Sequence, residues 1–218
     1  MTTAPTPTDK VVRIASKVTT VLLHPLLLPI YGALLTLFGA TPYAGMPHPV
    51  NVGVLSAVGV FACANPLAVI TLFMMSGRVE ELEMPSREER VWPLICSGVS
   101  ICLAMLLLNT HNTPRPLLGM VLGEGILLVA IGTCSVFWKV SLHTAGSGAF
   151  LSFVSVTGMT YHTDFSTWAA VAFVCAGLTA WTRLYERAHT WRQLLAGYLM
   201  GLAVMGTVMN FVMHRPVF

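Results

Sequence analysis

Apolar residues in this chain fall in long, nearly uncharged blocks, and several of these blocks reach about 20 residues. A helix needs roughly that length to cross the ~30 Å hydrocarbon core of a bilayer. Only 10% of the 218 residues are charged, whereas a soluble domain carries about 25%. Such a chain cannot cover a soluble surface, which excludes a globular cytosolic enzyme, a nucleic-acid-binding protein and a disordered regulator. The pattern predicts a polytopic membrane protein.

Because irregular backbone cannot face lipid, we predict an all-α fold, a polytopic transmembrane helical bundle of about seven spans. A polar, cytoplasmic N-terminal segment, 1–17, precedes a single transmembrane domain over 18–218. Small residues such as Gly98, Gly125 and Gly201 are interpreted as points where helices approach closely. The predicted spans are 18–40, 51–76, 92–108, 117–137, 142–160, 167–181 and 194–213.

Basic residues in the connections set the predicted orientation. Ten of the 12 lysines and arginines fall on one side of the predicted spans, and only Arg115 and Arg215 fall on the other. Cytoplasmic loops are enriched in Lys and Arg, so we predict a cytoplasmic N-terminus, an external C-terminus and insertion in the inner or plasma membrane. The ten residues on the cytoplasmic side are Lys10, Arg13, Lys17, Arg78, Arg87, Arg90, Lys139, Arg183, Arg187 and Arg192.

Polar residues cluster at the predicted cytoplasmic ends of the spans, in segments 77–91, 138–144 and 182–193. His143 and His189 stand at or near helix N-termini, where exposed backbone N–H groups favour an anion. One imidazole can attack phosphorus while another, protonated, gives its proton to the leaving oxygen. These residue types predict phosphoryl transfer, while snorkelling of basic side chains to lipid headgroups is the competing explanation of the cations.

Two of these segments resemble signatures of the phosphatidic-acid phosphatase type 2 superfamily. Thr-Arg-x5-His-x3-Gln at 182–193 is similar to the third signature, Ser-Arg-x5-His-x3-Asp, and Ser-Leu-His at 141–143 is similar to the second, Pro-Ser-Gly-His. The resemblance covers about 135–213. It implies a core of that superfamily's fold in the C-terminal half, an activity on lipid phosphates or diphosphates, and no metal or other cofactor.

By motif position, the resemblance implies that His189 is the nucleophile forming a phosphohistidine and that His143 is the acid for the leaving alcohol. Gln193 takes the place of the aspartate that orients the nucleophilic histidine. The candidate phosphate-binding residues are Arg183, Ser141, Lys139, Arg87 and Arg90. The first signature, Lys-x6-Arg-Pro, is absent at its usual place. Lys139, Arg87 and Arg90 are candidates to substitute for it.

The leading hypothesis is a divergent lipid-phosphate phosphatase or phosphotransferase that works through a metal-independent phosphohistidine. The alternative is a catalytically silent relative that binds lipid headgroups or acts as a scaffold. Gln193 favours this alternative, because an amide cannot stabilise an imidazolium as a carboxylate does. A second alternative is a small transporter, for which Glu124 within the fourth predicted span is the hint. The expected partners are membrane lipids or lipid phosphates, and no nucleic acid.

Other residues are open to more than one interpretation. Glu124 either contacts substrate or relays protons, or else it caps a neighbouring helix or is protonated. His24, beside Pro25, is interpreted as satisfying backbone carbonyls that prolines leave free. We favour segment 77–91 as a solvated, self-paired amphipathic segment, over a segment that folds its arginines onto the two histidines. The five cysteines lack metal-ligand spacing and are interpreted as buried small hydrophobes.

Overall fold

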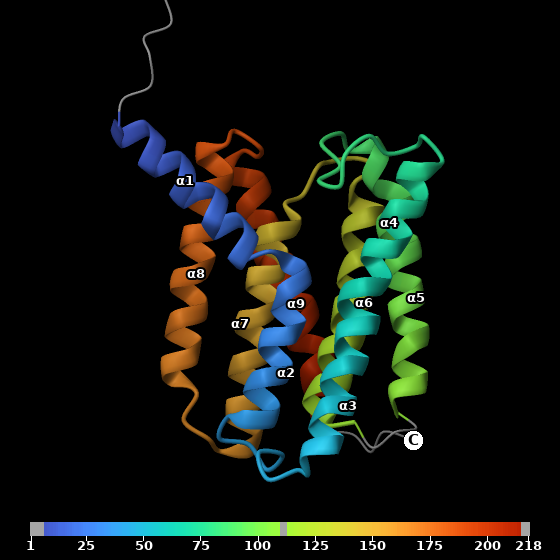
Figure 1. Cartoon of the computed structure of the whole chain (residues 1–218), viewed down its shortest axis with the longest axis vertical. Helices are drawn as coiled ribbons and strands as arrows, with labels where there is room; N and C mark the ends of the chain where they lie inside the picture. The colour runs from blue at the N-terminus through green and yellow to red at the C-terminus, as the bar shows by residue number, and fades with distance from the viewer. Residues whose placement is uncertain (1–6, 110–112, 215–218) are drawn as a thin grey trace, which may run out of the picture.

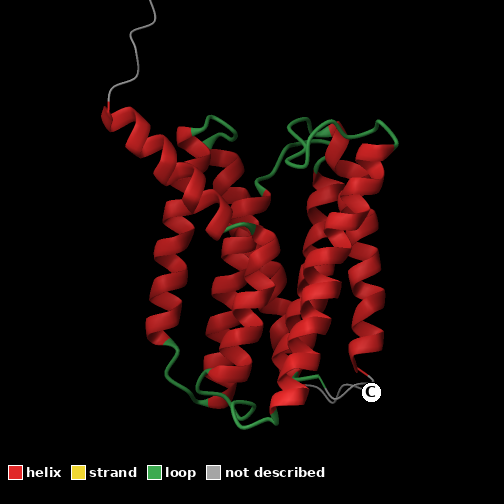
Figure 2. Cartoon of the chain, viewed as in Figure 1, coloured by secondary structure: helices red, strands yellow, loops and turns green. Residues whose placement is uncertain are grey.

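In the computed structural model, the described residues are 7–109 and 113–214, and within these ranges the chain forms helices and connections without a strand (Figures 1 and 2). The predicted all-α bundle is confirmed. The α-helices are α1 (Pro7–Leu22), α2 (Leu28–Phe38), α3 (His48–Val58), α4 (Asn65–Met75), α5 (Val91–Asn109), α6 (Arg115–Cys134), α7 (Leu142–Tyr161), α8 (Ser166–Tyr185) and α9 (Trp191–His214). Shorter elements are the 3-10 turns η1 (Pro25–Leu27) and η3 (Glu88–Arg90) and the π-helix η2 (Gly59–Ala64).

Four helical units are long and apolar enough to cross a membrane, namely α3–η2–α4, η3–α5, α6 and α9. The bent pair formed by α1 and η1–α2 makes a fifth if it counts as one span. The predicted number of seven spans is therefore wrong. All seven predicted segments are helical, but α7 and α8, each 20 residues long, have too low a mean hydropathy to qualify. The apolar helices indicate an integral membrane protein.

The first predicted span, 18–40, is broken rather than continuous. Helix α1 already begins at Pro7, and it meets the η1–α2 unit with a bend of 42°. Pro25 has no amide N–H, so the helical hydrogen-bond ladder cannot continue through it. His24 Nδ1 accepts a hydrogen bond from Leu26 N at 3.3 Å. The ring therefore accepts a hydrogen bond from a backbone N–H group, whereas the sequence predicted that it would donate to a backbone carbonyl.

Helix α7 is enclosed by other helices, which explains how it tolerates polar residues. Its buried side chains include Thr144 and Ser152, and Ser152 Oγ donates a hydrogen bond of 2.8 Å to the Leu202 carbonyl in α9. The backbones of α7 and α9 touch at Gly201, where an added methyl group would overlap the Ala145 carbonyl oxygen. Close packing at this predicted small residue is confirmed, and it makes the α7–α9 pair rigid.

The polar connections lie together at one end of the bundle. Figure 1 shows the start of α1 and the α4–α5, α6–α7 and α8–α9 connections at that end, which we call the basic end, and α9 finishing at the other. Ser141 N donates to the Gln193 carbonyl at 3.3 Å, and Thr144 Oγ1 donates to the Leu194 carbonyl at 2.8 Å. The starts of α7 and α9 are thereby fixed side by side. Residues 1–6 and Arg215 lie outside the described residues.

Candidate functional site

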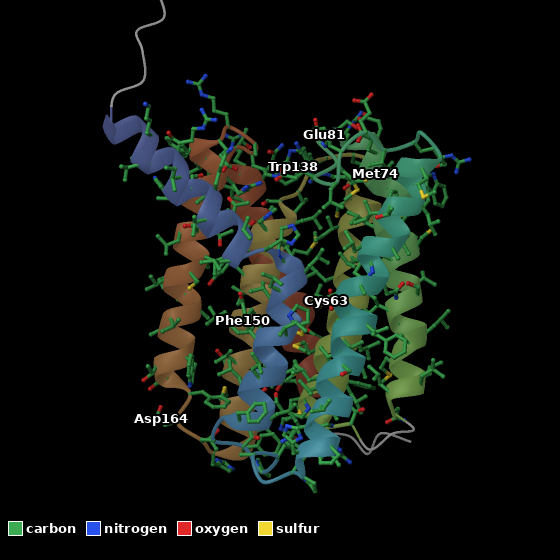
Figure 3. All side chains as sticks on the ribbon, viewed as in Figure 1. Cys63, Met74, Glu81, Trp138, Phe150 and Asp164 are labelled. Atoms are coloured by element: carbon green, nitrogen blue, oxygen red, sulfur yellow. The ribbon has the colours of Figure 1, made fainter. Side chains whose placement is uncertain are left out.

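A cavity of about 180 Å³ lies at the basic end, among the α1–α2 break, α4, α5, α6 and the connections leading into α5, α7 and α9. Figure 3 shows Glu81, one of its lining residues, at that end. Its ionisable or hydroxyl-bearing lining residues are His24, Glu81, Glu83, Arg90, Ser97, Glu124, Lys139, His143, Arg183 and His189. The remaining lining residues are Pro, Leu, Ile and Ala. The structure thus brings five of the eight predicted site residues to one cavity.

His189 is buried in the connection that leads into α9, with 9% of its surface exposed. Its Nδ1 lies 3.2 Å from Gln193 Oε1, and the same oxygen accepts a hydrogen bond from Thr190 N at 3.0 Å. Because the Thr190 N–H group needs an acceptor, that atom is the amide oxygen, and Nδ1 must carry the ring proton that it donates. The other ring nitrogen of His189, Nε2, is then left with a lone pair.

The pKa of His189 lies at about 4, below the usual 6.5. Burial is the largest cause, since it disfavours the charged ring, and the positive charges of Arg90, Lys139 and Arg183 act in the same direction. The hydrogen bond with Gln193 opposes the shift. At neutral pH the ring is therefore uncharged, which is the form in which a histidine acts as a nucleophile.

His143 lies in the first turn of α7 and is 8% exposed. Its ring meets the ring of His24 edge-on, with 5.1 Å between the centroids. His143 Nε2 is buried and has no hydrogen-bond partner among the described residues. The side chain lies close enough to Arg183 for the charge of that guanidinium to act on it. The two predicted catalytic histidines thus share one cavity, as roles in one reaction require.

Arg183, near the end of α8, is 2% exposed, and carboxylates already balance its charge. Its Nη1 lies 3.3 Å from Glu83 Oε2, and its Nη2 lies 2.6 Å from Glu186 Oε2. Nη2 also donates to Thr20 Oγ1 at 2.8 Å, which ties α1 to α8. An anionic ligand can therefore reach the Nη1 side of this guanidinium only by displacing Glu83.

Arg90 holds segment 77–91 over the cavity. It is 4% exposed and donates to three backbone carbonyls, those of Met84 at 2.7 Å, Val140 at 2.9 Å and Glu83 at 3.2 Å. Arg90 thus departs from the preferred solvated segment, whereas Arg87, which is exposed and paired with Glu88, agrees with it. The reason for the departure is that Arg90 satisfies three carbonyls of two connections, which a solvated side chain does not do.

Lys139 lines the cavity from the α6–α7 connection and is only lightly engaged. Its Nζ donates to the Ala188 carbonyl at 3.4 Å, the one hydrogen bond that this ammonium makes within the described part of the chain. Burial, and then the charge of Arg90, lower the pKa of Lys139, while Glu83 opposes that change. The ammonium has donors to spare for a ligand.

Three of the predicted site residues are not among the residues that line the cavity. Ser141 is fully buried and caps α7, accepting a hydrogen bond from Thr144 N at 3.5 Å. Gln193 lies behind His189 and orients it. Arg87 is exposed and pairs with Glu88 at 2.7 Å. Their contacts make Ser141 and Gln193 supports of the site, whereas Arg87 stands outside it.

Sequence reasoning missed several side chains at this site, among them His24, Glu83, Glu186, Ser97 and Thr20. Glu186 stands three residues after Arg183, a spacing at which opposite charges pair on a helix, so this pair had a local signal. Glu83 is one of several acids in segment 77–91, and nothing in the sequence separates it from the others. His24 comes from the far end of the chain, and only the tertiary fold brings it to His143.

No group of three or more His, Cys, Asp or Glu side chains could hold a metal ion within 7–109 and 113–214. The five cysteines are free thiols. The cavity lining offers imidazole, carboxyl, hydroxyl and cationic groups.

No protein-family model, curated protein or solved structure matches this chain. The resemblance of 135–213 to the phosphatase signatures stays a prediction.

Proposed function

We propose that the protein is a divergent lipid-phosphate phosphatase or phosphotransferase of the phosphatidic-acid phosphatase type 2 kind, with its site in this cavity. One observation carries the proposal: two buried histidines, His143 and His189, share the cavity with Lys139, Arg90 and Arg183. A neutral imidazole with a free Nε2 is a nucleophile, and cations bind the anionic group that it attacks.

The phosphate of the substrate is bound by Lys139 and, after Glu83 has moved away, by Arg183. Glu83 is suited to leave because its side chain is 59% exposed and belongs to a connection rather than a helix. Glu186, which is only 30% exposed, stays paired with the other side of the guanidinium. One anion replaces another, so the buried arginine is never left without a counter-charge.

A second, largely apolar cavity of about 60 Å³ adjoins the first and suits a hydrocarbon chain. The two cavities share Pro25, Glu124, Leu128 and Leu142 as lining residues. Apart from Glu124, the second is lined by apolar residues of η1, α2, α6, α7 and α9, including Phe150, which Figure 3 places near the middle height of the bundle. A lipid with its phosphate at the basic end and its chain toward the bundle centre fits this arrangement.

The reaction consists of two displacements at phosphorus. His189 Nε2 attacks phosphorus, the P–O bond to the lipid alcohol breaks, and the leaving oxygen takes a proton from His143. The ring of His143 must gain that proton when the anionic phosphate binds, because burial and the charge of Arg183 lower its pKa in the free protein. Water then attacks the phosphohistidine, gives its proton back to His143 and releases inorganic phosphate. A second alcohol in the place of water makes the same reaction a phosphotransfer. Gln193 orients the nucleophile throughout by accepting its Nδ1 proton.

A catalytically silent protein that binds lipid phosphates in the same cavity is the second candidate. Two observations favour it. The Nη groups of Arg183 are engaged by Glu83, Glu186 and Thr20, and Gln193 supplies no negative charge to stabilise a charged His189 ring. The two candidates share the ligand and differ in turnover.

The basic end of the bundle faces the cytoplasm in this proposal, because cytoplasmic connections concentrate Lys and Arg. The site then serves lipids of the cytoplasmic leaflet, and α9 ends on the external side. Single cysteines at Glu81 and Asp164, which Figure 3 shows at opposite ends, test this in a cysteine-free background. An impermeant thiol reagent applied to intact cells should label the cysteine at 164 and spare the one at 81; the reverse labelling contradicts the orientation.

Phosphate release tests the function directly. The purified protein in detergent, with EDTA present, is given a panel of lipid monophosphates and diphosphates, and inorganic phosphate is measured. We expect release that His189→Ala abolishes and that His214→Ala, a matched change at the opposite end of α9, leaves intact. Binding of a lipid phosphate without release from any member of the panel supports the silent candidate. Neither binding nor release contradicts both.

A further inference from the structure

The inner end of the cavity, which we call its floor, carries two polar side chains that the proposed phosphoryl transfer does not use. Glu124 lies near the middle of α6, and Ser97 lies in the second turn of α5. Both line the same cavity as the two histidines. Ser97 is fully buried, and neither its Oγ nor Glu124 Oε2 has a hydrogen-bond partner among the described residues.

Unpaired polar groups at this depth are costly. A buried hydroxyl left without a partner costs about 1–3 kcal/mol, and the next serine on the same helix shows the usual solution. Ser100 Oγ exchanges hydrogen bonds with the Asn65 side chain, at 2.9 and 3.0 Å. Helix α5 therefore satisfies one serine within the protein and leaves the other, together with Glu124, facing the cavity. Groups placed in this way are binding groups for a ligand.

The floor differs in charge from the upper part of the cavity. The cations of the upper part, Arg90, Lys139 and Arg183, come from the connections and from the last turn of α8, at the basic end. Around Ser97 and Glu124, the other lining residues of α4, α5 and α6 are Pro66, Ile70, Leu94 and Leu128. A floor with hydrogen-bonding groups, apolar walls and no cation among its described residues suits a neutral polar group and not a second anion.

We infer that Glu124 and Ser97 form a second polar subsite, which binds a neutral hydrogen-bonding group of the ligand's backbone while the phosphate lies at the basic end. The position of the phosphate rests on the proposed function. Lipid phosphates built on glycerol or on a sphingoid base carry an ester, hydroxyl or amide group close to the phosphate. Polyprenyl phosphates carry only hydrocarbon there. The subsite therefore selects glycerol- or sphingoid-based lipid phosphates over polyprenyl phosphates.

Equilibrium binding to the full-length protein in nanodiscs of a neutral lipid tests this selection. The probes are dioctanoyl phosphatidate, sphingosine 1-phosphate and farnesyl phosphate, and the first two distinguish a glycerol backbone from a sphingoid one. The variants are Glu124→Leu and Ser97→Ala, with Ser100→Ala as the matched control outside the cavity. Glu124→Met, which keeps the size of the side chain without its hydrogen-bonding oxygens, covers the case in which Glu124→Leu fails to fold, with the same expected result.

At least one of the first two probes should bind wild-type protein about tenfold tighter than farnesyl phosphate, which is what one or two well-placed hydrogen bonds are worth. Glu124→Leu and Ser97→Ala should remove that difference without changing the affinity for farnesyl phosphate, and Ser100→Ala should keep it. Equal affinity for all three probes, or an equal loss of affinity for all three in the variants, overturns the subsite but leaves the proposed function standing. In either case Glu124 and Ser97 are only hydrated and do not contact the ligand. No binding of any probe overturns both.

Discussion

The α7–α9 pair and the N-terminal segments that cover it contribute to the cavity in different ways. Helices α7 and α9 touch through their backbones at Gly201, and the two histidines stand directly at their starts. Helix α1 and segment 77–91 reach the same cavity through polar side chains, and both of them, by way of Thr20 and Glu83, engage Arg183. The rigid pair thus holds the two histidines, while the covering segments hold groups that restrain Arg183.

Removal of His189 should separate the two regions most sharply. We expect His189→Ala to lower phosphate release by about 10⁴-fold or more, because loss of a nucleophile removes the whole covalent route. Thr20→Ala, which removes a contact made by a covering segment, should change the rate by only a few-fold. Initial rates of phosphate release from a lipid phosphate measure both. Equal losses in the two variants would contradict the division of roles.

The rigidity of the α7–α9 pair is tested by adding a single methyl group. Gly201→Ala should lower the free energy of unfolding by about 1–3 kcal/mol, because the new methyl meets the Ala145 carbonyl, which cannot move aside cheaply. The control is Gly177→Ala in α8, where nothing lies within 4 Å of the added carbon. There alanine should be neutral or stabilising by up to about 1 kcal/mol. Thermal or SDS-induced unfolding in detergent measures the stability of both variants. A Gly201→Ala protein as stable as the Gly177→Ala control contradicts close backbone contact.

In the proposed mechanism, placing a carboxylate behind His189 should raise turnover. Gln193→Asp can still accept the Nδ1 proton of His189, and its charge stabilises the ring when it becomes positive. We expect kcat for phosphate release to rise about 10-fold to 100-fold. Gln193→Asn, which shortens the side chain equally without adding charge, is the control. A rise in both variants, or in neither, contradicts an electrostatic role for position 193.

Removal of the Glu83 carboxylate from Arg183 should strengthen ligand binding, by a smaller factor than the change expected for Gln193→Asp. Glu83→Gln removes the charge that pairs with Nη1, so a lipid phosphate no longer has to displace it, and we expect about fivefold tighter binding. Glu80→Gln makes the same change of charge at an exposed neighbour outside the cavity. Titration of both variants with dioctanoyl phosphatidate measures the difference. Identical affinities contradict competition between Glu83 and the phosphate.

The burial of His189 also predicts a small dependence of stability on pH. Its folded pKa of about 4 lies below the ordinary 6.5, so the unfolded chain binds the proton first as the pH falls. Stability should therefore be lost between pH 6.5 and pH 4 and be fully present above that window. His189→Gln should flatten this part of the curve of unfolding temperature against pH. An unchanged slope contradicts a buried, neutral ring.

The helical character of all seven segments was predictable from the sequence, because hydrophobic blocks are local properties, and both predicted histidines line the cavity. The sequence did not predict the number of spans, since α7 keeps polar residues such as Thr144 and Ser152 buried against other helices and so needs less hydropathy. It also missed the contact between Glu83 and Arg183. That pairing depends on how segment 77–91 folds over the cavity, which no local spacing encodes.

The most direct measurement is to trap the reaction at its covalent stage. Protein mixed with dioctanoyl phosphatidate is quenched in base, where a phosphohistidine survives, digested and examined by mass spectrometry. We expect one added phosphoryl group on the peptide that contains His189, absent in His189→Ala and longer-lived when His143 is replaced by alanine. A substrate that is turned over without phosphorylating His189, or a phosphoryl group on any other residue, would contradict a nucleophilic histidine in this cavity.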